Sequence, residues 1–77
     1  MSIIPVFTAR QMVSLLLKAG FKILRQKGSH IRLQHPITKR ATTVAMHVRT
    51  LSQDLAAEIL KQAGISVSEL LRLLGKK

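Results

Sequence analysis

The spacing of hydrophobic residues changes along the chain, and each change predicts a new structural element. In the first segment the apolar residues recur at the spacing of one helix face: Met12, Leu15, Leu16 and Ala19. Thr8 and Gln11 have the spacing of a capping box, in which each side chain bonds a free backbone N–H of the first turn. Gly20 is placed to end the segment in the left-handed conformation. The pattern predicts an N-terminal helix.

After this helix the period shortens towards two, which is typical of β-strands. Three such runs follow one another, separated by short polar turns: residues 21–27, 30–34 and 41–46. The first turn is the pair Gly28-Ser29, two residue types that favour turns. Three consecutive strands with short turns predict an antiparallel meander with one buried and one open face.

The helical period returns from Thr50 onwards. The predicted inward positions of this helix are Leu55, Ile59, Leu60 and Ala63. Gly64 is placed to stop it, and residues 66–69 have the spacing of a second capping box. We expect a short last helix with these residues inward: Val67, Leu70, Leu71 and Leu74. The order α-β-β-β-α, with a short extra C-terminal helix, predicts one α+β two-layer sandwich domain over residues 1–77.

Strand parity assigns the side chains of the sheet to its two faces. If Ile31, Leu33, Val44 and Met46 point at the helices, the open face carries the alternate residues: His30, Arg32, Gln34, Thr43, Ala45 and His47. Pairing these strands around the second turn sets His30 near Ala45. His47 then lies diagonally from His30, at roughly 7–8 Å.

The charge balance indicates that this domain has a binding surface for a charged partner. The 77 residues include 13 Lys and Arg against 3 Asp and Glu, a net charge of +10. Residues 1–49 hold nine of the bases and no acid. A field of one sign predicts a polyanionic partner, with nucleic acid first, an acidic protein second and an anionic membrane surface third.

The composition also excludes several classes. Without cysteine the chain has no disulfide and no thiolate metal site, which fits a reducing cytoplasm. No apolar run approaches the roughly 20 residues of a membrane span, and the N-terminus lacks the layout of a signal peptide. We therefore expect a cytoplasmic protein that is neither secreted nor inserted in a membrane, and we expect no membrane partner.

The exposed histidines suggest acid–base chemistry on a phosphodiester. Imidazole exchanges a proton near neutral pH, and surrounding cations hold phosphates. RNA supplies its own nucleophile, the 2′-hydroxyl, whereas DNA does not. The three carboxylates all follow residue 50, so a two-metal site has little support, and we expect neither a metal nor a cofactor. His35, in the turn before Pro36, is expected only to be exposed, and His47 stays open between a structural and a site role.

The motifs around these histidines resemble those of the HicA toxin family, the YcfA-like mRNA interferases. The resemblance rests on Lys27-Gly28-Ser29-His30 between two strands, on the strand ending at His47, and on the segment 60–66, Leu-Lys-Gln-Ala-Gly-Ile-Ser. The opening Leu-Leu-Leu-Lys-Ala-Gly-Phe at 15–21 also fits, and the likeness covers residues 8–74. Many members have a proline in the last strand, where this chain has Ala45-Met46-His47. That difference concerns the shape of the sheet edge.

The resemblance implies a double-stranded-RNA-binding-domain-like fold and a ribosome-independent RNase that cleaves mRNA, in a bacterial type II toxin–antitoxin module. It also implies a HicB-type antitoxin that covers the active site, and it places the catalytic histidine at His30. The RNA-binding residues we expect around it are Arg25, Lys27, Gly28, Ser29, Arg32 and His47. Two alternatives use the same basic surface: a non-catalytic RNA- or DNA-binding module, and a protein-interaction subunit with an acidic partner.

Overall fold

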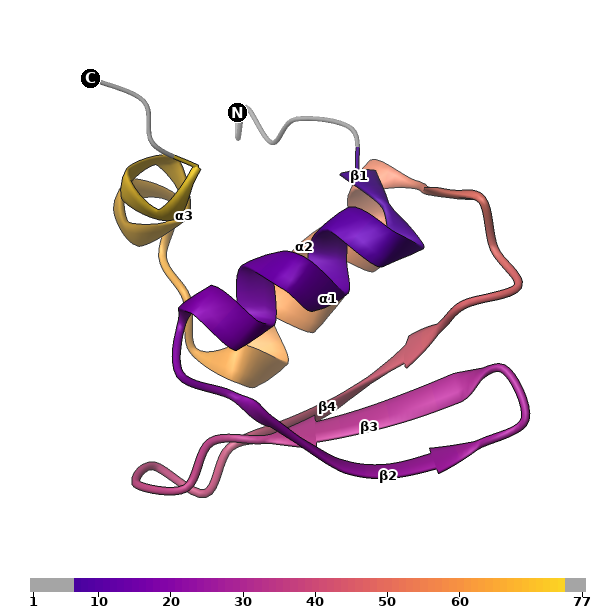
Figure 1. The fold of residues 1–77 in the computed structure, drawn as a ribbon. Coiled ribbons are helices and arrows are strands. Elements are labelled where there is room, and N and C mark those ends of the chain that lie inside the picture. The colour runs from indigo at the N-terminus through magenta and orange to yellow at the C-terminus, as the bar shows by residue number, and fades with distance from the viewer. Residues whose placement is uncertain (1–6, 75–77) are drawn as a thin grey trace.

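Two helices cover one face of a three-stranded antiparallel sheet (Figure 1). The computed structural model describes residues 7–74. Its elements are β1 (Phe7–Thr8), α1 (Ala9–Lys18), β2 (Lys22–Lys27), β3 (His30–Gln34), β4 (Ala41–Ala45), β5 (Thr50–Leu51), α2 (Gln53–Ala63) and α3 (Val67–Leu73). Helices α1 and α2 lie on the same side of the β2-β3-β4 sheet, whose other face is open (Figure 1). This arrangement confirms the predicted α+β two-layer sandwich.

Helix α1 begins and ends as its sequence predicts. Thr8 Oγ1 accepts a hydrogen bond from the Gln11 backbone N–H at 3.1 Å, and Gln11 Oε1 accepts one from the Thr8 N–H at 2.9 Å. The capping box is therefore complete. Gly20, just beyond the helix, has a φ of 101°, a conformation that side chains disfavour.

The pairing of β3 with β4 confirms the predicted register. Ile31 lies opposite Val44, and His30 lies opposite Ala45. Ile31, Leu33 and Val44 are buried beneath the helices, as parity predicts, and Met46 is half-buried just after β4. The open face of β3 and β4 therefore carries His30, Arg32 and Thr43.

The segment after β4 differs from the prediction. Thr50 and Leu51 do not begin a helix: they form β5, which pairs with β1 in a separate two-stranded sheet. Helix α2 begins only at Gln53, after Ser52 caps it by accepting a hydrogen bond from the Leu55 N–H at 3.1 Å. Sequence reasoning missed both strands because two residues are too short to show a period.

The buried face of α2 confirms the prediction at Ile59, Leu60 and Ala63 and differs from it at one position. Leu55 was expected inward but is 40% exposed. Its place in the core is taken by Ala56, which has the i, i+3, i+4, i+7 spacing with Ile59, Leu60 and Ala63. Thr42 on β4 is also buried, because its hydroxyl donates a 2.8 Å hydrogen bond to Gln62 Oε1 on α2. This bond ties the sheet edge to the helix.

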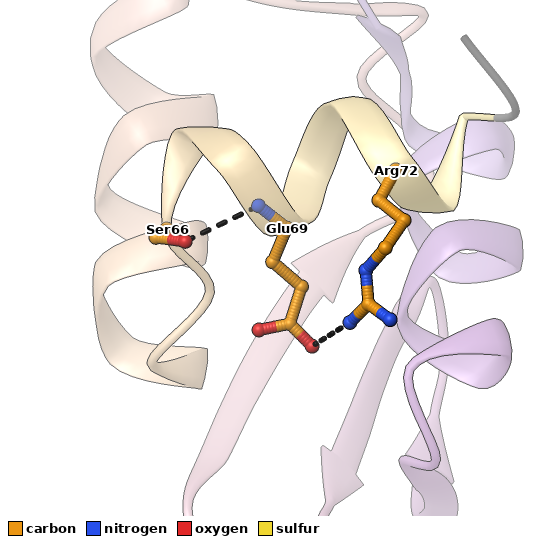
Figure 2. Close-up of polar contacts among 3 residues, drawn as sticks. All are labelled: Ser66, Glu69 and Arg72. Carbon is orange, nitrogen blue, oxygen red and sulfur yellow. Dashed lines mark hydrogen bonds and ion pairs between the residues drawn. The ribbon is translucent and has the colours of Figure 1, made fainter. Parts of the chain in front are cut away.

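Helix α3 is capped by Ser66, whose Oγ accepts a hydrogen bond from the Glu69 N–H at 3.2 Å (Figure 2). Arg72 forms an exposed 3.5 Å ion pair with Glu69 one turn later (Figure 2). Only Leu70 is fully buried, while Val67 and Leu71, both predicted inward, are each 41% exposed. A helix of seven residues at the side of the molecule has too little covering structure to bury a wide face (Figure 1).

Candidate functional site

The open face of the sheet owes its composition to a bulge in β2. Ile23 lies opposite the buried Leu33, so strict alternation would turn Arg25 towards the helices. The register shifts between Ile23 and Arg25, which leaves Leu24 as the extra residue and sets Arg25 opposite Arg32. Side chains of directly opposite residues share a face. The bulge thus places Arg25 on the open face, as bulges near functional sites commonly do.

The same register brings a row of cations to the open face. Lys27 lies opposite His30, and Lys22 lies opposite Gln34. Arg25 opposite Arg32 is an unfavourable pair, because like charges facing each other across strands destabilise a sheet. This pair lowers the stability of the free protein, but it becomes favourable when an anion binds between the two guanidinium groups. Lys22 lies on this face as well, a position that was missed from the sequence although simple alternation with Ile23 indicates it.

Carboxylates are segregated from this face. Asp54 and Glu58 lie on α2 and Glu69 lies on α3, whereas β2, β3 and β4 contain none. Among residues 7–74, no group of three or more His, Asp or Glu side chains is arranged to hold a metal ion. The strands themselves therefore contribute only positive charge to this face, and Glu58 of α2 approaches it beside Arg32, with which it lines a pocket.

The turn between β2 and β3 is a two-residue hairpin loop formed by Gly28 and Ser29. Gly28 has a φ of 60°, and a Cβ atom added there would meet no other atom within 4 Å. Glycine is needed here for its backbone conformation, as at the first position of type II′ hairpin turns. The space around Gly28 is open, so a phosphate can approach the backbone closely.

Beside this turn lie two histidines from different parts of the chain. The rings of His30 and His47 are in edge contact, with centroids 5.6 Å apart and planes at 64°. Ser29 Oγ and His47 Nδ1 share a 3.1 Å hydrogen bond. The Met46 N–H donates to the Ser29 carbonyl at 2.6 Å, which fixes the segment after β4 against the hairpin turn. Both rings are exposed, and the predicted proximity of His47 to His30 is confirmed.

His35, at the other end of β3, differs from the expectation of simple surface exposure. Its ring is half-buried and edge-on to Phe21, with centroids 5.3 Å apart. Its Nδ1 accepts hydrogen bonds from the backbone N–H groups of Ile37 and Thr38, at 3.1 and 3.3 Å. The ring therefore holds the β3–β4 turn together through local hydrogen bonds, while its burial depends on the contact with Phe21, which is distant in the sequence.

The structure thus brings together the predicted site residues at one end of the open face. His30, Lys27 and the Gly28-Ser29 turn are contiguous, and His47 joins them from beyond β4. Arg25 and Arg32 lie next along the same face. Arg32 also donates a 3.4 Å hydrogen bond to Thr43 Oγ1 across the strands. An exposed imidazole pair beside a row of cations is suited to binding a phosphate and exchanging protons with it.

The model of the HicA toxin of bacterial toxin–antitoxin systems matches residues 9–65, which include α1, the three-stranded sheet and α2. The chain belongs to the HicA toxin family. As a HicA protein it is the toxin of a toxin–antitoxin pair, whose partner is an antitoxin, and toxins of this family are generally of the RNase type. No curated protein matches the chain. Within residues 7–74, the HicA chain has no helix long and apolar enough to cross a bilayer.

Proposed function

We propose that this HicA protein is a metal-independent endoribonuclease that cleaves mRNA, with His30 as its catalytic residue. The observation that carries the proposal is the exposed His30 imidazole directly opposite Lys27, on a sheet face that holds Arg25 and Arg32 and no carboxylate. A phosphate bound by these cations lies within reach of the His30 imidazole, a group of the kind that serves as a general acid or base.

The attacking oxygen in this proposal comes from RNA, because the Ser29 hydroxyl, although hydrogen-bonded to His47, has no carboxylate on the surrounding strands to complete a Ser-His-Asp triad. The RNA 2′-hydroxyl loses its proton and its oxygen attacks the adjacent phosphorus. The P–O5′ bond breaks, and the leaving oxygen takes up a proton. The products are a 2′,3′-cyclic phosphate and a 5′-hydroxyl. His30 carries one of these protons, while Arg25, Lys27 and Arg32 hold the phosphates and Gly28 allows close approach of the backbone.

The antitoxin partner is, in this proposal, of the HicB type, and it neutralises the toxin by covering the open face. Strand β2 supports this placement because it is an edge strand with all six residues exposed. Ile23, which shares the face of the buried Leu33, and the bulged Leu24 expose apolar surface at this sheet edge, 49% and 57%, next to the cations that the same strand presents on the open face. An acidic partner with an apolar centre matches that surface. The cell compartment of this pair is the cytoplasm, where mRNA is found.

Cleavage of mRNA in excess EDTA by the wild type and by His30→Ala tests the proposal. The wild type is expected to cut without added metal, leaving a cyclic phosphate. The His30→Ala variant is expected to bind RNA and cut about 10²–10⁴-fold more slowly. Gln26→Ala, an exposed change on the same hairpin, is the matched control and should cut at the wild-type rate.

Undiminished cleavage by His30→Ala would remove this residue from the mechanism. Salt-sensitive RNA binding by a wild type that forms no product would favour the non-catalytic module instead. Expression in growing cells provides a second readout: arrest by the wild type and growth with His30→Ala are expected.

A further inference from the structure

The hydrogen bond between Ser29 and His47 gives the second histidine a defined orientation. Ser29 Oγ lies 3.1 Å from His47 Nδ1, and the His47 ring contacts the His30 ring at a centroid distance of 5.6 Å. Nδ1 is thereby occupied, so Nε2 is the nitrogen left for a substrate. A residue whose only role was charge attraction would need neither a fixed ring nor one exposed nitrogen.

Cleavage through the 2′-hydroxyl requires two proton transfers at different oxygens. A base removes the proton of the attacking 2′-oxygen, and an acid supplies one to the leaving 5′-oxygen. These oxygens lie on opposite sides of phosphorus when the displacement is in line, so one imidazole does not contact both at once. Two imidazoles on one open face meet the requirement, and residues 7–74 place only His30 and His47 in contact with each other.

We infer that His47 is the second proton-transfer group of the reaction and that Ser29 is its positioning residue. This inference rests on the ribonuclease function proposed above. One histidine accepts the 2′-hydroxyl proton as the O2′–P bond forms. The other donates its proton to the 5′-oxygen as the P–O5′ bond breaks. The pair ends the step with one proton gained and one lost, so protons balance without a metal or a further reactant.

Ser29 suits a histidine that exchanges its proton at Nε2. In that case Nδ1 keeps its hydrogen in both the neutral and the protonated ring, and the Ser29 hydroxyl oxygen accepts a hydrogen bond from Nδ1–H in both. The contact therefore persists when His47 gains or loses its proton at Nε2. The Met46-to-Ser29 backbone bond holds the two segments together independently of either side chain. Ser29 and His47, both expected from sequence to bind RNA, thus acquire separate roles.

The pH dependence of cleavage under kcat and kcat/KM conditions tests the inference. The wild type is expected to show a bell-shaped profile, as an acid and a base acting together produce. His47→Ala should lower kcat about 10²–10⁴-fold with little change in KM and should lose one limb of the bell. His30→Ala should lose the opposite limb. Lys61→Ala, an exposed cation on α2, should keep both limbs and the wild-type rate.

The outcomes separate this inference from the proposed function. An active wild type, an inactive His30→Ala and a His47→Ala variant that keeps both limbs, with only KM raised, would make His47 an RNA-binding residue and overturn the inference alone. A wild type that does not cut RNA, or a His30→Ala variant as fast as the wild type, would overturn the proposed function itself.

The role of Ser29 has its own measurement. Ser29→Ala is expected to lower kcat about three- to tenfold, because it removes one hydrogen bond to the histidine. Ser29→Thr keeps a hydroxyl and should restore most of this loss. Wild-type kcat in Ser29→Ala, or a change confined to KM, would contradict a positioning role. Because these sites are at the surface, far-UV circular dichroism should show wild-type folding in each variant.

Discussion

The two ends of strand β3 each carry a histidine, and the two residues have opposite environments. His30, at the first end, exposes its ring beside His47 and lies opposite Lys27. His35, just beyond the other end, is half-buried against Phe21 and bonds two backbone N–H groups of its turn. At the first end the imidazole rings are exposed to a ligand. At the second end the His35 Nδ1 atom accepts backbone hydrogen bonds that stabilise the turn.

This difference shows that residue type and strand position do not by themselves distinguish a site histidine from a structural one. The distinction lies in what each ring nitrogen does. At His35 the Nδ1 lone pair is already shared by Ile37 and Thr38. The His30 ring is exposed and contacts the exposed His47 ring, which is oriented by its hydrogen bond to Ser29. A candidate site histidine is therefore recognised by a ring nitrogen that is not used in a structural hydrogen bond.

The largest expected effect is that replacing His30 lowers activity, whereas replacing His35 lowers stability. His30→Ala should reduce RNA cleavage about 10²–10⁴-fold and leave the free energy of unfolding unchanged. His35→Ala should do the reverse: it should lower the free energy of unfolding by about 1–3 kcal/mol, because two backbone donors lose their acceptor, and keep the rate of the folded protein. Urea unfolding and single-turnover cleavage of both variants provide the two readouts. A His35→Ala variant that folds stably but does not cut would contradict the division.

The next effect concerns the glycines at the two ends. A Cβ at Gly20 would lie 2.9 Å from His35 Nε2, and its φ of 101° is unfavourable for any side chain. At Gly28 the same atom would meet nothing within 4 Å, and only the φ of 60° resists it. Gly20→Ala should therefore destabilise the protein by about 2–3 kcal/mol and Gly28→Ala by about 1 kcal/mol. Equal unfolding midpoints for the two variants would show that the His35 end is not the more tightly packed.

A smaller effect is expected from the cations of the open face. Replacing Arg25 or Arg32 by alanine should weaken RNA binding and reduce the slope of log K against log salt by about 0.7 per residue for a single strand. Each single change should also relieve the like-charge pair, so the unfolding midpoint should stay level or rise slightly. Lys61→Ala on α2 is the control. An unchanged slope for Arg25→Ala, measured by fluorescence anisotropy over a salt series, would place the RNA elsewhere.

The sequence predicts most of the fold because each major element has a strong local signal. The Thr8–Gln11 capping box, the meander and the stop at Gly64 are all confirmed, and Gly64 has the left-handed φ of 75° expected of a helix end. The predictions that fail concern the strands β1 and β5, which are too short to show a period, and single side chains at the margin of a helix face, such as Leu55. Such details depend on which neighbours cover a residue.

The site was only partly accessible from the sequence. Parity alone places His30 and Arg32 on the open face, because β3 is regular. The position of Arg25 opposite Arg32 depends on the bulge at Leu24, which has no signal in the local pattern. The Ser29–His47 bond joins residues 18 positions apart, so it exists only after the strands have paired.

The most direct test of the account is the cleavage of one RNA with and without a single 2′-deoxy nucleotide at its cut site, in excess EDTA. If the transcript supplies the attacking oxygen to the His30–His47 site, the substituted strand should bind with unchanged affinity and resist cutting at that position. Cleavage of the 2′-deoxy strand at the rate of the all-RNA strand would contradict the account.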